Sequence, residues 1–112
     1  DLMWQQRSAD VFLGLPYDIA MYGLLLEMLA KGAGLEPGEL IAQLGDCHLY
    51  TNHRDQAIKY VGRIKEHKLP ELKLNKGLQY NKGKLFIPTI NDIEILNYES
   101  HPPIKAPLSV GQ

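Results

Sequence analysis

The fold is decided by the stretch QRSADVFLGLPYDIAMY, residues 6–22. Its first half is too rich in polar residues for an ordinary buried strand, and such a strand is expected to form the floor of a polar pocket. Gly14 and Pro16 then end the strand, since proline removes a ladder donor and glycine permits a sharp turn. A helix pattern follows at once. A strand, a tight turn and a helix N-terminus beside Arg7 together predict an anion site.

The helix after this turn is expected to span residues 17–31. Pro16 suits a first helical turn, and Asp18 suits the positive end of the helix dipole. Apolar residues cover nearly the whole circumference, which predicts a helix that is buried on most sides. Gly32 and Gly34 are expected to end it.

Residues 39–50 alternate in the manner of a strand. The period of two carries Asp46, His48 and Tyr50 onto one face, where they predict a second wall of the pocket. Asp46 is interpreted as a structural residue that orients the turn before His48. Cys47 falls on the opposite face and is expected to be a packed small residue.

The remainder of the chain predicts one amphipathic helix and short strands. The helix is expected over residues 52–67, with Asn52 as N-cap and Asp55 completing a capping box. Short strands are expected within residues 69–74, 85–90 and 92–98, with a turn-rich surface loop at 75–84. Three prolines within residues 101–107 predict an extended path. Composition and pattern together support an α+β class.

Length and composition restrict the class of protein. The 112 residues suit one domain, with 45% apolar and 22% charged residues. A formal net charge of -1 gives no argument for nucleic acid or membrane, so neither DNA nor a membrane is expected as a partner. One cysteine excludes an internal disulfide framework and fits a reducing compartment. Residue 1 falls at the start of an expected strand, which predicts a missing N-terminal segment.

Three motifs resemble the C-terminal part of the folate-dependent thymidylate synthase family, which includes a deoxycytidylate hydroxymethylase branch. They are QRSADVFLGLPYDIA at 6–20, GDCHLYTNH at 45–53 and SHPPIKAPLSV at 100–110. The resemblance covers essentially the whole chain and departs most at 65–90. It implies an α+β fold with a mixed sheet packed against the long buried helix, a cytoplasmic location, and a homodimer formed by sheet packing. Residues 1–112 are thus expected to be a single C-terminal segment.

The resemblance also implies a function. The family transfers a one-carbon unit from 5,10-methylenetetrahydrofolate to C5 of a pyrimidine nucleotide, after a cysteine thiolate adds to C6. The implied substrate contacts are Arg7 and Ser8 at the phosphate of the nucleoside monophosphate, and His48 and Tyr50 at the ribose hydroxyl. The implied folate contacts are Asp10 at the pterin, Leu13 and Gly14 along the cofactor surface, and Ser109 in a tail that closes over the folate. Gly111 and Gln112 run past the usual end of the family.

The family's catalytic cysteine lies upstream of the first motif, in a Pro-Cys-His segment that these 112 residues do not contain. Cys47 cannot replace it, because it stands where the family commonly carries threonine and no activating neighbour is apparent. The chain by itself is therefore expected to be inactive and to contribute binding contacts only.

Asp18 stands where thymidylate synthases carry an asparagine that reads uracil. An ionised aspartate can only accept hydrogen bonds, which suits the 4-amino group of cytosine. This substitution predicts a cytidine nucleotide as substrate, as in the hydroxymethylase branch, where the adduct takes up water instead of hydride.

Several alternatives stay open at the level of sequence. An acid in a first helical turn stabilises a helix by about 0.3–1 kcal/mol without any ligand, so Asp18 has a purely structural interpretation. Arg7 could be an ion-pair partner of Asp10. The complete protein could be an ordinary dUMP-methylating thymidylate synthase. The chain could also be a non-catalytic nucleotide- or RNA-binding module, although its lysines at 73, 76, 82 and 84 are too sparse to argue for RNA.

Overall fold

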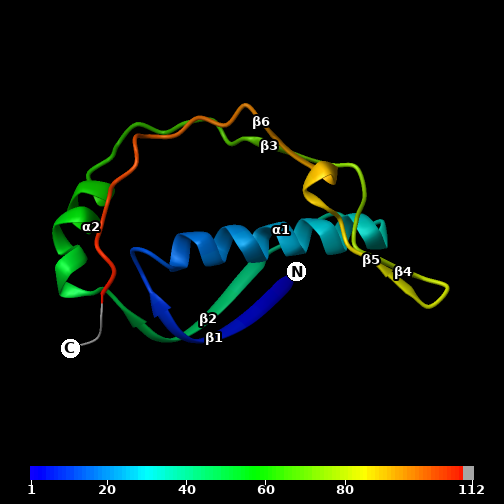
Figure 1. The fold of residues 1–112 in the computed structure, drawn as a ribbon, viewed down its shortest axis with the longest axis horizontal. Helices are drawn as coiled ribbons and strands as arrows, with labels where there is room; N and C mark the ends of the chain where they lie inside the picture. Colours follow the sequence, from blue (N-terminus) through cyan, green and yellow to red (C-terminus); the bar gives the residue numbers. More distant parts are fainter. Residues whose placement is uncertain (110–112) are drawn as a thin grey trace.

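The computed structural model of the protein describes residues 1–109, which form two helices and three pairs of strands (Figure 1). The elements in chain order are β1 (Leu2–Asp10), α1 (Leu15–Ala33), β2 (Leu40–His48), η1 (Thr51–His53), α2 (Arg54–Val61), β3 (Glu71–Leu74), β4 (Gln79–Asn81), β5 (Lys84–Phe86), η2 (Ile90–Asp92) and β6 (Ile93–Leu96). The predicted α+β class is confirmed. The strands pair as parallel β1–β2 and antiparallel β3–β6 and β4–β5, each pair a separate sheet within the described residues.

β1, α1 and β2 form a βαβ unit. Parallel strands need a crossover connection, and α1 supplies it, lying along one side of the strand pair in Figure 1. The small core sits between them: the Trp4 ring is 7% exposed and stacks on Tyr22, with 4.5 Å between ring centroids and 18° between ring planes. Ala9 and Ala30 complete the buried apolar set among the described residues. This unit positions every predicted site residue except Ser109 and Tyr50.

α1 begins and ends as the sequence predicts, but it is not buried. Pro16 lies in its first turn, and Gly34 ends it in the left-handed conformation, with φ 70° and its N–H directed at the carbonyls of Ala30 and Lys31. Ala30 is its one buried residue. Among the other elements, α1 contacts chiefly β1, β2 and β4, and its other residues are half-buried or exposed.

α2 is shorter than predicted and begins differently. It ends at Gly62, whose N–H donates to the carbonyl of Ile58, and residues 63–70 have no regular structure. The expected capping box at Asn52 and Asp55 is absent, because residues 51–53 form a 3₁₀ turn and no side chain caps α2. A capping box forms instead between Thr89 and Asp92 at η2.

The predicted loop at 75–84 contains strand β4. Lys82 and Gly83 both have positive φ, 50° and 78°, which suits the tight turn of a two-residue hairpin between β4 and β5. The turn residues were recognisable from the sequence, and the strand predicted within 85–90 overlaps β5, but β4 was not recognisable. Every residue of β4 is exposed, so no alternation of buried and exposed positions marks it.

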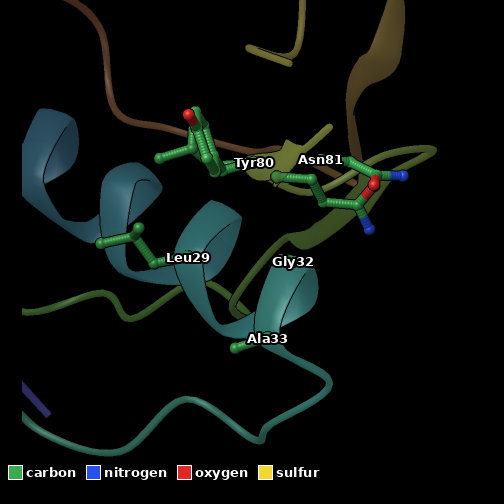
Figure 2. Close-up of a pocket in the computed structure, with 7 residues that line it drawn as sticks. Leu29, Gly32, Ala33, Tyr80 and Asn81 are labelled. Atoms are coloured by element: carbon green, nitrogen blue, oxygen red, sulfur yellow. The ribbon is translucent and has the colours of Figure 1, made fainter. Parts of the chain in front are cut away.

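The hairpin crosses the end of α1 at a glycine. Leu78 donates its N–H to the carbonyl of Met28 at 2.9 Å, and a Cβ on Gly32 would collide with the Leu78 carbonyl. Figure 2 shows Tyr80 and Asn81 beside Leu29, Gly32 and Ala33 at an open cavity of about 390 Å³. None of the predicted site residues lines this cavity. It is formed where the β4–β5 hairpin crosses the end of α1 and is not part of the candidate site.

The chain is extended for its length. Its radius of gyration is 16.9 Å and its extents are 50 × 32 × 23 Å, whereas a compact domain of similar size has a radius of about 13 Å. Large apolar side chains remain exposed far from the core, among them Ile64 at 93% and Leu69 at 91%. Such a surface is typical of a chain that packs against further protein. Among residues 1–109, no helix is long and apolar enough to cross a bilayer.

Candidate functional site

The predicted site residues gather at the carboxyl edge of the β1–β2 pair and at the start of α1. In the parallel register, Ser8 lies opposite Asp46 and Asp10 lies opposite His48. Paired residues of adjacent strands project from the same face of a sheet. The register therefore brings Ser8, Asp10 and His48 to one face, as the two-wall pocket predicted from the sequence requires. Ligands of α/β proteins commonly bind at this edge.

Asp10 holds the turn between β1 and α1. Its Oδ1 atom accepts hydrogen bonds from the backbone N–H groups of Phe12 at 3.3 Å and Leu13 at 3.4 Å. The alternative ion pair with Arg7 is not formed, and within residues 1–109 the Arg7 guanidinium has no carboxylate partner. One oxygen of Asp10 is thus structural, which leaves Oδ2 for a ligand.

Gly14 brings two acidic residues close together. Its N–H donates to the carbonyl of Asp10 at 3.1 Å, and its own carbonyl accepts from the N–H of Asp18 at 3.0 Å. A Cβ at this position would lie 3.2 Å from the Asp10 carbonyl oxygen and 3.8 Å from Asp18 Oδ2. The turn is therefore tight at Gly14, where a side chain would press on the Asp10 carbonyl, and it sets both carboxylates at the start of α1.

Asp18 is oriented by Gln6, a residue that sequence reasoning did not assign to the site. Gln6 Nε2 donates to Asp18 Oδ2 and to the carbonyl of Ser8, both at 2.9 Å, while its Oε1 accepts from Trp4 Nε1 at 3.1 Å. Both amide hydrogens of Gln6 and its oxygen are occupied. The only signal in the sequence was the period of two that sets Gln6 on the same face as Trp4 and Ser8.

His48 is oriented by Asp46, which confirms the structural interpretation of that acid. His48 Nδ1 lies 3.1 Å from the Asp46 carbonyl and 3.3 Å from Asp46 Oδ1. Both partners are acceptors, so Nδ1 carries the hydrogen and Nε2 of the neutral ring is an acceptor. The Tyr50 ring meets His48 edge-on at 4.9 Å between centroids. The two rings therefore meet just beyond the end of β2, and the second wall of a pocket stays a prediction.

Arg7 and Ser8 do not share a face of the sheet. Adjacent residues of a strand project to opposite sides, and Arg7 is exposed whereas Ser8 is half-buried. Arg7 lines a shallow depression with Gln5 and Gln43, whose side chains bond each other at 2.9 Å. For both residues to bind one ligand group, the long side chain of Arg7 must therefore extend around the edge of β1 to the face on which Ser8 lies.

Cys47 is exposed and not packed, contrary to the expectation from the sequence. The alternation of β2 does place it on the face opposite His48, where its register partner Ala9 is buried but Cys47 itself is left exposed. The described residues also contain no cluster of three or more His, Cys, Asp or Glu side chains that could hold a metal ion.

Leu13 and Ser109 lie on different parts of the site's border. Leu13 lines an apolar groove of about 570 Å³. The groove runs between the start of α1 and α2, and its other lining residues are Val11, Phe12, Pro16, Tyr17, Ala20, Ala57, Tyr60, Val61, Arg63, Tyr98 and Ile104. Ser109 Oγ donates to Asn52 Oδ1 at 2.7 Å. The predicted overrun at Gly111 and Gln112, and Val110 of the third motif, lie outside the described residues.

His53 is a second residue that sequence reasoning missed. It is fully buried, and its Nε2 bonds the carbonyl of Pro107. Its spacing from Tyr50, at the end of the GDCHLYTNH motif, was the one available signal.

Comparison with known proteins identifies the class of this fold and site. The family described as thymidylate synthase matches residues 1–110. A thymidylate synthase of Leuconostoc mesenteroides subsp. mesenteroides is 49% identical over 109 residues, which cover 97% of this chain and 32% of that protein. The structure of thermostable thymidylate synthase A from Bacillus subtilis superposes with a TM-score of 0.77 at 33% identity, covering 90% of this chain and 34% of that one.

The chain belongs to the thymidylate synthase family, as the three motifs predicted. It spans about a third of the length of the relatives that it matches.

Proposed function

We propose that this chain supplies nucleotide- and folate-binding contacts to a thymidylate-synthase-family enzyme. The complete enzyme transfers a one-carbon unit from 5,10-methylenetetrahydrofolate to C5 of a pyrimidine deoxynucleotide. Family membership supports the reaction class. The gathering of Ser8, Asp10 and His48 at one edge of the β1–β2 pair supports a binding role for these residues.

The nucleotide lies, in this proposal, along the carboxyl edge of β1 and β2. Ser8 and the long side chain of Arg7 bind the phosphate from two sides of the strand, since a guanidinium fork and a hydroxyl match phosphate oxygens. His48 Nε2 accepts from a ribose hydroxyl because Asp46 occupies Nδ1. Tyr50 supplies a phenolic partner beside it.

The folate lies against the turn and the apolar groove. Asp10 Oδ1 is occupied by backbone N–H groups, which leaves Oδ2 to accept from an N–H of the pterin. The groove lined by Leu13 suits the flat aromatic portion of the cofactor. Gly14 allows close approach at the turn, and Ser109 lies in the segment that closes over the ligand. When bound, the folate supplies the one-carbon unit, and these residues hold and orient it.

Asp18 directs the site towards a cytidine nucleotide. The observation that carries this proposal is the Gln6 contact, in which both amide hydrogens of Gln6 are spent on Asp18 Oδ2 and the Ser8 carbonyl. Asp18 therefore presents its other oxygen, Oδ1, as an acceptor. Cytosine offers a 4-amino donor at this point, whereas uracil offers the acceptor O4. Two acceptors facing each other leave a buried polar group unpaired, at a cost of about 1–3 kcal/mol.

A uridine nucleotide is the second candidate. The 49% identity to a protein named thymidylate synthase favours it. Asp18 can then accept from uracil N3–H, but O4 finds a donor in Asp18 only if the carboxyl carries a proton. The two candidates therefore differ in one hydrogen bond.

The nucleophile comes from outside these 112 residues. Cys47 projects from the face opposite His48 and is exposed to solvent, so a nucleotide at the proposed edge lies beyond its reach. We propose that residues 1–112 act as a single C-terminal segment, completed by a segment that contributes the thiolate. The uncovered sheet face of β1 and β2 suits the family homodimer.

The test uses a complete enzyme. In the grafted synthase, as we call it, these 112 residues replace the matching segment of the Leuconostoc mesenteroides protein. Tritium release is measured from C5-labelled dCMP and dUMP in the presence of 5,10-methylenetetrahydrofolate. Faster release from dCMP supports the cytidine proposal, and clearly faster release from dUMP overturns it. Nucleotide binding without release from either substrate, in a graft that melts cooperatively, would favour a non-catalytic binding module.

A further inference from the structure

His53 lies where three segments of the site meet. Its ring centroid is 5.7 Å from that of Phe12, in the turn after β1, and 5.9 Å from that of Tyr50, after β2. Its Nε2 bonds the carbonyl of Pro107 in the C-terminal segment. The side chain is completely buried, the only one of its size in the described residues. His53 therefore joins three segments: the turn after β1 that is proposed to bind the folate, the ribose wall formed by His48 and Tyr50, and the C-terminal segment at Pro107.

The C-terminal strap, residues 97–109, is otherwise held by weak contacts. It runs antiparallel to the segment after α2, as the orange-red trace beside the green one shows in Figure 1. Its side-chain contacts there are Arg63 with the Pro102 carbonyl, His101 with the Lys65 carbonyl at 2.9 Å, His67 with Glu99 at 3.6 Å, and the edge-on rings of His67 and His101, with centroids 4.8 Å apart. These contacts are exposed or half-buried, and exposed pairs contribute little. The buried His53 bond is the firm anchor of the strap.

Packing alone does not explain a histidine at position 53. The Pro107 carbonyl only accepts, so His53 Nε2 carries the hydrogen and Nδ1 is left as an acceptor. Nδ1 is buried and has no partner within residues 1–109. An unpaired buried polar atom is destabilising, and an apolar side chain of similar size would avoid it. The hydrogen bond that Nε2 donates to the Pro107 carbonyl explains why a histidine stands at position 53.

A second bond comes from the neighbouring residue. Asn52 Oδ1 accepts from Ser109 Oγ at 2.7 Å. Both bonds rise from η1, immediately after His48 and Tyr50, and both end in residues 107–109 of the strap. The clasp, as we call these two bonds, ties the strap to the ribose wall.

We infer that His53 is a positioning residue that clasps the C-terminal strap over the site and so sets the affinity for the folate. The inference rests on the proposed function, in which the strap closes over the cofactor. His53 contacts neither substrate nor cofactor. Its loss should therefore weaken folate binding through the strap, with the nucleotide contacts of His48 and Tyr50 retained.

The test compares His53→Leu with His53→Gln in the grafted synthase. Glutamine places an amide N–H near the position of His53 Nε2, whereas leucine fills similar space without a donor. The matched control is His101→Leu, which removes a like bond to a backbone carbonyl outside the clasp. Asn52→Ala removes the second bond at an exposed position and does not depend on refilling the core.

Two readouts are taken for each variant. The KM for 5,10-methylenetetrahydrofolate should rise about tenfold in His53→Leu, with the nucleotide KM within about twofold, and His53→Gln should restore it to within about threefold. Hydrogen exchange at the amides of Leu108 and Ser109 should speed up in His53→Leu and, less, in Asn52→Ala, but not in His101→Leu. Exchange needs no turnover, so it tests the clasp even if the proposed reaction is wrong.

Equal damage from leucine and glutamine would overturn the inference, because it would make His53 a packing residue only. Unchanged exchange at residues 108–109 in both His53→Leu and Asn52→Ala would also overturn it. If His53→Leu fails to fold, the contrast of His53→Gln and Asn52→Ala with His101→Leu decides the same question.

Discussion

The βαβ unit and the C-terminal strap are built differently. In the βαβ unit, polar side chains bond one another: Gln6 holds Asp18, and Asp46 holds His48. At the strap, by contrast, three side chains bond backbone carbonyls: Arg63 and His53 bond those of Pro102 and Pro107 in the strap, and His101 of the strap bonds that of Lys65. Networks of side chains orient groups for recognition, whereas contacts to carbonyls hold a segment in place. The comparison assigns recognition to the first region and closure to the second.

The βαβ unit and the second half of the chain, residues 49–109, also differ in how much of their apolar surface is covered. Trp4 and Ala9 are buried within the βαβ unit, whereas Ile64 and Ile90 are 93% and 86% exposed in the second half. Long exposed apolar side chains favour association with further protein. The predictions below test this division, beginning with the largest expected effect.

The isolated 112-residue chain should lack both activity and a cooperative unfolding transition. It contains no activated thiol, and α1 has little cover within the described residues. We expect aggregation or a broad thermal transition by circular dichroism, and no tritium release. A sharp melt that matches that of the grafted synthase would show that neither α1 nor the exposed apolar side chains of the rest of the chain need further protein.

Asp18→Asn in the grafted synthase should shift the preference from dCMP towards dUMP by about 100-fold, because a site built for one hydrogen-bonding pattern discriminates by orders of magnitude. The ratio of kcat/KM for the two nucleotides measures it. Glu27→Gln, which changes an acid farther along α1, serves as the control. No shift would reduce Asp18 to a helix-start acid and weaken the claim that the βαβ unit reads the base.

Gly32→Ala should lower the free energy of unfolding of the grafted synthase by about 1–3 kcal/mol, since the added Cβ collides with the Leu78 carbonyl where the hairpin crosses α1. Gly23→Ala is the matched control, because its Cβ would lie 3.8 Å from Leu40 Cδ2, an ordinary contact. It should be neutral or stabilise the helix by up to about 1 kcal/mol. Urea denaturation measures both. Equal effects of the two substitutions would mean that the hairpin does not pack closely against α1 at Gly32.

The smallest effect is expected at Asp92 in the second half. The backbone N–H of Thr89, which donates to the carboxylate, lowers the pKa of Asp92 below its ordinary value. The resulting stabilisation is present above the ordinary carboxyl pKa and is lost as the pH falls through the lowered one. NMR titration of the grafted synthase should therefore show Asp92 titrating at lower pH than a free aspartate, and Thr89→Ala should keep most of the shift. An ordinary pKa would mean that the capping box does not persist in solution.

Much of the βαβ unit was predictable because its signals are local. Proline and glycine mark the start and end of α1, and a period of two marks β2. The α+β class and the positions of Asp46 and His48 on one face followed from these. The strand predicted within 85–90 overlaps β5, but β4 was not predictable, because all its residues are exposed and show no alternation of burial.

The sequence by itself determined the family, the residue types of the site and their order along two strands. The tertiary structure alone decided which residues of the two strands lie opposite each other and what holds each one. It set Asp10 opposite His48, joined Gln6 to Asp18, and brought Pro107 to His53 across 54 positions of the chain. The reason is physical: periodicity reports the side on which a residue projects, but hydrogen bonds between distant residues depend on the path of the chain between them.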